Sequence, residues 1–260
     1  MARVVAVANQ KGGVGKTTTA VNLAASLAAA ECRTLLIDLD PQANATSSLG
    51  FPPGSAPAGR DVYRALTGER SLAELSLDTD LQYLKLVPAS ADLVGAEVEL
   101  ASLPGRELRL RQALPTVRDQ YRIVLIDTPP SLGLLTLNAL VAADGVLVPL
   151  QCEYLALEGL AALLQTIELV RAELNPALRL DGLVLTMFDA RNNLAQQVAR
   201  DAREHFAGQV FRTVVPRNVR LSEAPSHGKP ALLYDISSKG AMSYLQLAEE
   251  FLERIKNGQS

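Results

Sequence analysis

Residues 11–18 read K-G-G-V-G-K-T-T and come just after an apolar run at residues 4–8. Glycines let backbone N–H groups approach an anion closely, and a helix that begins at such a loop adds the positive end of its dipole. An apolar strand, this loop and a helix therefore predict a phosphate-binding site. The usual pattern, G-x-x-x-x-G-K-[ST], needs a glycine five residues before Gly15, but Gln10 stands there. The variant K-G-G-x-G-K-T fits at every position and adds a second lysine, Lys11.

The loop residues are suited to a nucleoside triphosphate. Lys16 is placed to reach the β- and γ-phosphates, Thr17 to ligate Mg²⁺, and Thr18 to lie near the α-phosphate. The expected nucleotide contacts are Lys11, Gly12, Gly13, Val14, Gly15, Lys16, Thr17 and Thr18. A plain glycine-rich turn before a helix is the alternative, but it needs neither two lysines nor two threonines at these offsets.

The extra lysine makes the chain resemble the deviant Walker A ATPases. The resemblance runs from residues 6–10 to residues 228–230. It implies ATP and Mg²⁺ as cofactors, with slow ATP hydrolysis that a partner stimulates. It also implies that Lys11 crosses a dimer interface to the nucleotide of the other subunit, so that ATP becomes part of that interface.

Two further segments bring carboxylates to strand ends. Residues 33–40 read R-T-L-L-I-D-L-D and precede P-Q, and residues 121–130 read Y-R-I-V-L-I-D-T-P-P. Ligands of open α/β sheets bind at the C-terminal ends of strands, so Asp38, Asp40 and Asp127 are candidates. Asp127 fits the Walker B position that supports the Mg²⁺ shell. An acidic strand end, with Asp40 capping a turn, is the alternative for the first segment.

The resemblance divides these carboxylates by role. It places Asp38 near the metal and the attacking water, and it makes Asp40 necessary for hydrolysis. The expected metal ligands are Thr17, Asp38 and Asp127, and the expected catalytic residues are Lys11, Lys16, Asp38, Asp40 and Asp127.

A segment near the C-terminus supplies candidates for the adenine site. Residues 214–226 read V-V-P-R-N-V-R-L-S-E-A-P-S. Together with D-L-D-P-Q and D-T-P-P, this segment makes the chain resemble the ParA/Soj branch of partition ATPases. In that branch P-R-N contacts the adenine, and the resemblance therefore implicates Pro216 and Asn218. A planar base needs a flat apolar wall and a hydrogen-bonding edge, and these two residues offer both. A plain strand-to-helix turn is the alternative.

Composition and pattern predict one α/β domain over residues 1–260. The chain is 48% hydrophobic with a net charge of −3, and helical and strand patterns alternate. This alternation predicts a doubly wound, mostly parallel sheet with helices on both faces. Expected strands are 3–8, 34–39, 84–88, 123–127, 145–149, 180–188 and 210–215. Expected helices are 15–30, 92–100, 108–117, 132–142, 158–173, 194–206 and 239–256, and residues 50–60 are an expected surface loop.

Other features limit the class of protein. Only ten residues precede Lys11, so we expect no N-terminal helix-turn-helix domain. Cys32 and Cys152 are far apart, which is typical of reduced thiols in a cytoplasmic protein. Neither cysteine belongs to a C-x-x-C pair, which a metal-delivery ATPase would require.

Positive charge gathers between residues 191 and 229. This window holds seven Lys and Arg but three acids, a balance of +4 in a chain of net charge −3. Such a surface binds phosphates without reading sequence, and a dimer would double it. The candidates are Arg191, Arg217, Arg220 and Lys229, of which Arg191 and Arg220 match segments that the resemblance implicates. A solvated charged surface is the alternative.

The leading hypothesis is therefore a DNA-partition ATPase. The expected partners are a second copy of the chain when ATP is bound, nonspecific double-stranded DNA on the nucleoid, and a ParB-type centromere-binding protein. A MinD-like membrane ATPase is the main alternative, since such proteins end in a basic amphipathic helix. Here Glu249, Glu250 and Glu253 would oppose an anionic membrane, so no membrane contact is expected. A nucleotide switch without hydrolysis is also conceivable, but all three carboxylates are retained.

Overall fold

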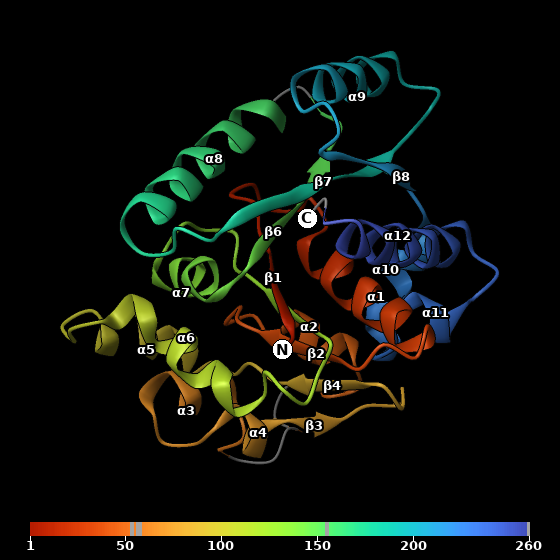
Figure 1. Cartoon of the computed structure of the whole chain (residues 1–260). Coiled ribbons are helices and arrows are strands. Elements are labelled where there is room, and N and C mark those ends of the chain that lie inside the picture. The colour runs from red at the N-terminus through yellow and green to blue at the C-terminus, as the bar shows by residue number, and fades with distance from the viewer. Residues whose placement is uncertain (53–54, 56–58, 154–155, 259–260) are drawn as a thin grey trace.

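The computed structural model describes residues 1–52, 55, 59–153 and 156–258. Within them, eight strands form one sheet in the order β3-β4-β2-β5-β1-β6-β7-β8 (Figure 1). The strands are β1 Arg3–Val7, β2 Thr34–Asp38, β3 Leu77–Asp78, β4 Leu84–Val87, β5 Ile123–Asp127, β6 Gly145–Gln151, β7 Arg179–Phe188 and β8 Val210–Pro216. All neighbours pair in parallel except β3 and β4, which are antiparallel at the edge. The predicted α/β fold with a mostly parallel sheet is confirmed.

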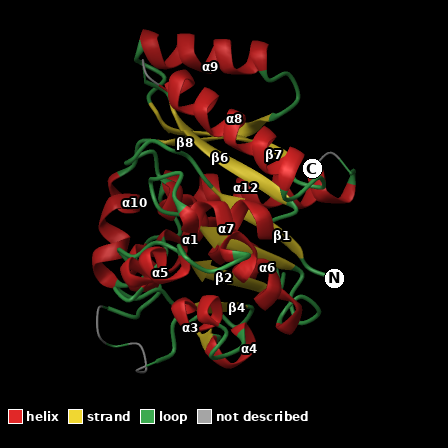
Figure 2. Cartoon of the chain, turned by 90° about the vertical axis from the view of Figure 1, so that its left-hand side faces the viewer, coloured by secondary structure: helices red, strands yellow, loops and turns green. Residues whose placement is uncertain are grey.

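Helices cover both faces of this sheet (Figures 1 and 2). The α-helices are α1 Lys16–Ala29, α2 Asn44–Ser48, α3 Val62–Thr67, α4 Leu72–Leu75, α5 Leu93–Leu100, α6 Arg109–Ala113, α7 Leu134–Ala142, α8 Ala156–Glu173, α9 Asn193–His205, α10 Val219–Glu223, α11 Ala231–Tyr234 and α12 Lys239–Lys256. Three short 3-10 helices are η1 Arg106–Leu108, η2 Leu114–Thr116 and η3 Ala224–His227. Helices α1 and α12 cover one face, and α5 to α9 cover the other.

The central strands explain why the sheet needs two layers of helices. In β1, Val4 and Ala6 belong to the core beneath α7 and α8, whereas Val5 and Val7 belong to the core beneath α1 and α12. All four side chains are fully buried. A strand buried on both faces reads as a continuous apolar run, which is why alternation is absent here.

Most predicted elements agree with the structure within two residues, and one difference is informative. The helix predicted over 108–117 is wrong as a continuous helix, because η1, α6 and η2 replace it. Pro115 lies in η2, and a proline removes the N–H that a continuing helix would use. The loop predicted over residues 50–60 lies partly outside the described residues. None of the helices in the described part of the chain combines the length and apolar character needed to span a bilayer.

The strand order brings the motif-bearing ends together. β5 lies between β1 and β2, and in the ladder Asp127 pairs with Val7 on one side and with Asp38 on the other. Residues in register on parallel strands point to the same side, so Asp38 and Asp127 end their strands side by side. The loop after β1 leaves from the same edge, which is where ligands bind in such sheets.

Candidate nucleotide site

The loop between β1 and α1 depends on glycine at two positions. Gly13 has φ 75° and Gly15 has φ 86°, values in the left-handed region that favours glycine. The turn at Gly15 lets α1 begin at Lys16, and the Thr19 N–H donates to the Gly15 carbonyl at 2.8 Å. The first N–H groups of α1 are thereby aimed at the space above the loop, as an anion site requires.

Lys16 is held inside the site. The residue is only 6% exposed, and its Nζ donates to the Lys11 carbonyl at 3.0 Å. Burial lowers the pKa of Lys16, and the charges of Asp127 and Asp40 oppose this effect. The ammonium therefore lies close to two carboxylates, where it can also meet an anionic ligand.

Asp38 has both carboxylate oxygens occupied. Oδ2 accepts from the Thr46 N–H at 2.8 Å and from the Thr46 hydroxyl at 2.7 Å, while Oδ1 accepts from the Asp40 N–H at 3.1 Å. Burial raises the pKa of Asp38 to about 6, although these hydrogen bonds favour its charged form. The Asp38 carboxylate therefore lies close to the loop, but both of its oxygens are already used in hydrogen bonds within the protein.

The carboxylate of Asp127, unlike that of Asp38, is not held by close hydrogen bonds from the described part of the chain. It is fully buried, and among the described residues neither of its oxygens has a hydrogen-bond partner. Burial, then the charge of Asp38, raise the pKa of Asp127 well above its usual range, while a nearby Thr17 hydroxyl opposes the shift. A buried carboxylate without a partner is costly, and a bound cation would satisfy it. Carboxylate and hydroxyl oxygens are the ligands that Mg²⁺ prefers, so Asp127 and Thr17 fit this ion.

Two cavities meet over the loop. The first, of about 390 Å³, is lined by the loop glycines, Lys16, Thr17, Asp40 and Gln42. The second, of about 330 Å³, is lined by Pro216, Asn218 and Tyr244 among others. Gly15, Thr18 and Met187 line both. The space beside Lys16 therefore adjoins a space that offers a proline wall and an amide, as an extended ligand with an anionic and a planar end requires.

The second cavity contains the predicted adenine residues. Pro216 ends β8, and the side-chain oxygen of Asn218 caps α10 by accepting from the Arg220 N–H at 3.0 Å. Its amide nitrogen is then the group available for a ligand edge. The adenine contacts stay a prediction, but the two candidates do lie in one cavity that continues from the loop.

Sequence reasoning missed two lining residues. Met187 borders both cavities with φ 50°, an uncommon value for a residue other than glycine, and no motif marks it. Tyr244 is fully buried in α12, and its hydroxyl lies 3.1 Å from the Thr19 hydroxyl of α1. A tyrosine with one hydroxyl in an otherwise apolar helix face is a weak signal that sequence alone could not assign.

Lys11 does not point into the loop. Its N–H is held by the Asn9 side chain at 3.0 Å, and its Nζ donates to Glu153 at 3.1 Å. Asn9 is itself fixed by donating to the Pro149 carbonyl at 2.8 Å. The backbone of Lys11 therefore sits firmly, and the end of its side chain lies on the segment that follows β6.

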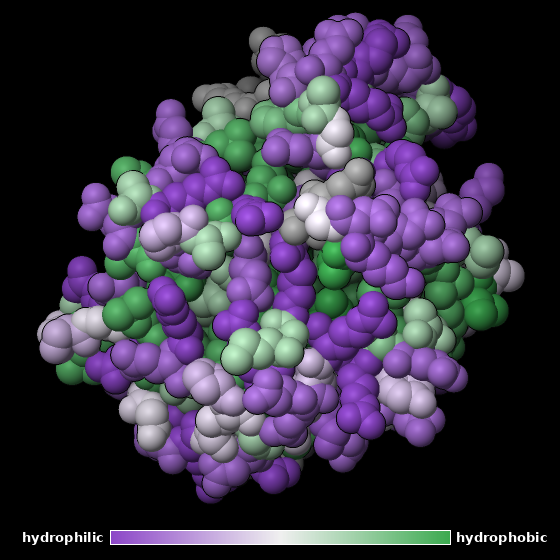
Figure 3. Space-filling view, in the orientation of Figure 1, coloured by the Kyte–Doolittle hydropathy of each residue, from purple (hydrophilic) through white to green (hydrophobic). Residues whose placement is uncertain are grey.

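The four candidate DNA-binding residues do not all lie in one place. Arg191 follows β7, and Arg217 and Arg220 follow β8, so these three extend from the ends of adjacent strands. Lys229 lines a different cavity, of about 440 Å³, with residues of α1, α2 and η3. The surface over neighbouring α9 is mostly hydrophilic (Figure 3).

Acids outside the counted window reduce the charge of this region. Arg191 pairs with Asp189 at 2.9 Å, and Arg220 pairs with Glu223 at 2.8 Å and with Asp235 at 3.3 Å. Asp189 and Asp235 lie just beyond the window of residues 191–229. The net positive charge of this surface in the folded protein is therefore smaller than the count over residues 191–229 indicates.

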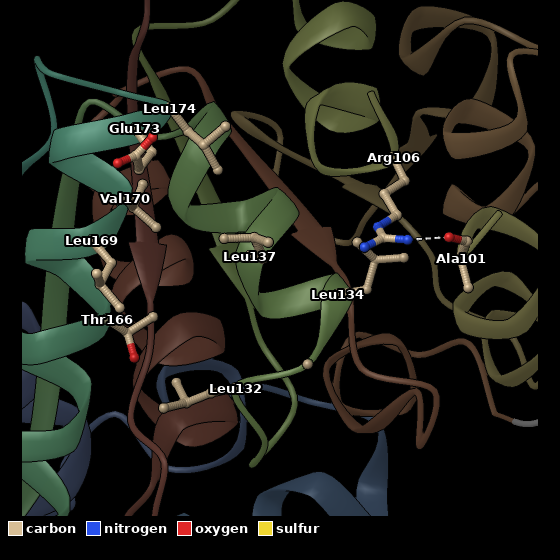
Figure 4. Close-up of a pocket in the computed structure, with 11 residues that line it drawn as sticks. Ala101, Arg106, Leu132, Leu134, Leu137, Thr166, Leu169, Val170, Glu173 and Leu174 are labelled. Carbon is tan, nitrogen blue, oxygen red and sulfur yellow. Dashed lines mark hydrogen bonds between the residues drawn. The ribbon is translucent and has the colours of Figure 1, made fainter. Parts of the chain in front are cut away.

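A larger hollow of about 550 Å³ lies away from the loop, between α7, α8 and η1 (Figure 4). Leu137, Leu169 and Val170 make it apolar, and the Arg106 guanidinium at its edge donates to the Ala101 carbonyl. It lacks the convergent polar groups of a catalytic site, so size alone does not make it the candidate.

Comparison with known proteins finds relatives along almost the whole chain. An AAA domain family model matches residues 2–180. The chromosome partitioning protein ParA of Myxococcus xanthus is 58% identical over 252 residues, which cover 97% of this chain and 88% of that protein. The chromosome-partitioning ATPase Soj of Thermus thermophilus is 56% identical over 255 residues, with 98% and 97% covered.

A solved structure agrees over the same length. It is described as cobyrinic acid a,c-diamide synthase from Mycobacterium smegmatis with bound ATP analog and magnesium. The TM-score is 0.86 at 40% identity, and the match covers 99% of this chain and 97% of that one.

Proposed function

The chain belongs to the ParA/Soj family of chromosome-partitioning proteins, and on that premise we propose that it is an ATP-driven partition switch. It binds ATP with Mg²⁺, dimerises with the nucleotide between two subunits, and holds double-stranded DNA without reading its sequence. Hydrolysis is slow until a ParB-type protein stimulates it, and it then releases the dimer from the DNA on the nucleoid.

The observation that carries this proposal is the pair of joined cavities. The cavity over the loop has the glycines, Lys16 and Thr17 that a triphosphate needs, and it continues past Met187 to Pro216 and Asn218. A free phosphate would need only the first space, and a nucleotide needs both. The solved relative with an ATP analog and magnesium supports the same assignment.

The orphaned carboxylate supports a divalent cation as the second component. Asp127, with Thr17 beside it, would hold Mg²⁺, which when bound neutralises phosphate charge. Lys16 would contact the phosphates from the loop side. The ion fits this chain because Asp127 has no other partner among the described residues.

Asp40 is the carboxylate that we infer would act on the attacking water. It lines the cavity over the loop, and its Oδ1 accepts from the Gln42 N–H at 2.9 Å, which fixes the carboxylate. A single carboxylate held in this way would support slow turnover, and ordering of the site by a partner would raise the rate.

DNA binding rests on the arginines that follow β7 and β8. Arg191 and Arg220 are at least partly exposed, at 91% and 46% of their side chains. Dimerisation would double these contacts, and the affinity of a protein for DNA rises steeply with the number of phosphates it neutralises. This gives ATP, through the dimer, control over DNA.

The membrane alternative is disfavoured by α12. Leu247 and Phe251 of this helix are fully buried against the sheet and α1, so its apolar face is already covered. An interfacial helix needs that face for lipid. Within the described residues, Glu250 is also taken up by hydrogen bonds to the Arg212 and Thr213 backbone.

An amide-forming activity, which the name of the solved relative suggests, is disfavoured by the cysteines. Acyl transfer through a covalent intermediate commonly uses an activated nucleophile such as a thiolate. Cys32 and Cys152 are both buried, and burial raises the pKa of each, that of Cys152 to about 11. Neither is a suitable nucleophile.

The proposal is tested by measuring binding to a random-sequence DNA duplex with Mg²⁺ and no nucleotide, ADP or ATP. Fluorescence anisotropy should show binding with ATP alone, together with a dimer in sedimentation velocity. Lys16→Ala should lose both, whereas Lys85→Ala, at a pair with Asp78 on the sheet edge, should keep both. Equal binding in all three nucleotide states would reject the switch.

A further inference from the structure

Thr46 joins the ends of two strands through one hydroxyl group. This residue of α2 is 3% exposed, and its Oγ1 donates to Asp38 Oδ2 at 2.7 Å. The same Oγ1 accepts from the Ala89 N–H at 3.0 Å. Asp38 ends β2 and Ala89 follows β4, its neighbour in the sheet. The hydroxyl is therefore used as donor and acceptor at once, both times inside the protein.

Asp38 and Asp127 differ in whether their carboxylate oxygens are free to bind a ligand. They are register partners on β2 and β5, and both are fully buried. Thr46 supplies two donors to one oxygen of Asp38, and the Asp40 N–H takes the other. Asp127 has no close hydrogen-bond donor on either oxygen among the described residues, although the Thr17 hydroxyl lies near it. The charge of Asp38 raises the pKa of Asp127, so the two carboxylates are close enough to repel each other, and hydrogen bonds to Asp38 stabilise its charge beside Asp127.

We propose that Thr46 is a positioning residue that commits Asp38 to the protein and thereby leaves Asp127 as the carboxylate for the cation. This inference rests on the proposed function, and it differs from the sequence-based expectation that Asp38 is itself a metal ligand. Hydrogen bonds that orient the groups around a metal commonly matter nearly as much as the ligands.

The same bonds fix the segment that carries Asp40. With Oδ2 held by Thr46, Oδ1 of Asp38 accepts from the Asp40 N–H, and Asp40 Oδ1 in turn accepts from the Gln42 N–H. The path from Thr46 through Asp38 to Asp40 consists of consecutive hydrogen bonds. Thr46 therefore reaches the hydrolytic carboxylate without lining the cavity over the loop.

Removal of the Thr46 hydroxyl should change both the hydrogen bonding of Asp38 and the position of the segment that carries Asp40. Thr46→Val keeps the backbone N–H but leaves Asp38 Oδ2 with one donor and the Ala89 N–H with no acceptor from this side chain. Buried groups that lose a partner are costly, so the arrangement that holds Asp38 and Asp40 should loosen and the site should hold Mg²⁺ less well. Thr46→Ser keeps the hydroxyl and should restore the arrangement.

Nucleotide binding with and without the cation gives a direct test. A fluorescent ADP analogue is titrated in Mg²⁺ and in EDTA, and the ratio of the two dissociation constants measures the coupling between ion and nucleotide. The matched control is Thr34→Val, which removes a buried hydroxyl that donates to the Cys32 carbonyl at the far end of β2.

We expect Thr46→Val to lower the coupling roughly 10-fold, with Thr46→Ser within about 2-fold of the wild type and Thr34→Val unchanged. Unchanged coupling in Thr46→Val, or an equal loss in Thr34→Val, would overturn the inference. Absence of nucleotide binding in the wild type would instead reject the proposed function.

A structure of the wild type with Mg²⁺ and nucleotide provides the second test, which does not depend on the folding of a variant. Asp38 still bonded to Thr46, with the cation on Asp127, supports the inference. A direct bond between Asp38 and the cation overturns it.

Discussion

Lys11 Nζ lies 3.1 Å from Glu153 Oε2 of the same chain. The pair joins the first residue of the phosphate-binding loop to the segment after β6, and Gln151 holds the other oxygen of Glu153. If Lys11 serves the nucleotide of a second subunit in the dimer, it must first leave this carboxylate. Within one chain, Glu153 therefore competes with the nucleotide of the other subunit for Lys11.

Glu153→Gln should therefore favour the ATP-bound dimer. Both side chains are partly exposed, at 32% and 49%, so the pair is worth little and the expected gain in dimer affinity is about 2- to 5-fold. Sedimentation velocity in ATP measures it. Glu168→Gln, which breaks a comparable pair with Arg171 on α8, is the control and should change nothing. A weaker dimer in Glu153→Gln would show that Glu153 assists association.

Asp127→Asn should stabilise the metal-free protein while removing its response to Mg²⁺. An amide avoids the cost of a buried carboxylate without partners, roughly 1–3 kcal/mol in the free energy of unfolding. Denaturant unfolding in EDTA measures stability, and nucleotide titration measures the response. Asp144→Asn is the contrasting control, because Asp144 accepts from the Val4 N–H and from Arg118, and its loss should destabilise the fold.

The gain from Asp127→Asn should also depend on pH. The pKa of Asp127 is raised in the folded state, so its favourable contribution is present below the unfolded value of about 4 and is lost as the pH rises through the folded pKa. The difference between variant and wild type should then be small near pH 4 and larger at pH 8. A difference that shrinks with rising pH would contradict the assignment.

Local patterns predicted the parts of the site that depend on neighbouring residues in the chain. The loop glycines, the strand ending at Asp127 and the limits of α12 could all be read from the sequence, because backbone freedom and apolar periodicity are local. The sequence did not reveal that Thr46 contacts Ala89, 43 residues away, or that Lys11 contacts Glu153, 142 residues away. Those contacts depend on strand order, which no single motif encodes.

The cysteines should react slowly in the folded protein. Burial raises the pKa of Cys152 to about 11 and also raises that of Cys32. At pH 8 the thiolate fraction of Cys152 is roughly 100-fold below that of a thiol with a pKa of about 9. Labelling with a chromogenic disulfide should show little reaction until urea exposes both thiols, and Cys152→Ala isolates the contribution of Cys32. Rapid labelling of the native protein would restore thiol chemistry as a candidate function.

Arg220 is the most informative test of the DNA surface, because its guanidinium is already held by two acids. It contacts Glu223 at 2.8 Å and Asp235 at 3.3 Å, and it lies over the Tyr234 ring at 6.0 Å. A phosphate must compete with these carboxylates, so the arginine contributes less to DNA affinity than a free one would.

Two variants should therefore act in opposite directions. Arg220→Ala should weaken ATP-dependent duplex binding and reduce the salt slope by about two for a dimer, since each lost phosphate contact removes about 0.9. Glu223→Gln should strengthen binding about 2- to 5-fold by releasing the guanidinium. Arg171→Ala on α8, which also breaks a pair spaced by three residues, is the matched control and should leave the slope unchanged. If Arg220→Ala keeps the full slope, the phosphates are neutralised elsewhere, and Arg191 becomes the residue to test because its side chain is 91% exposed.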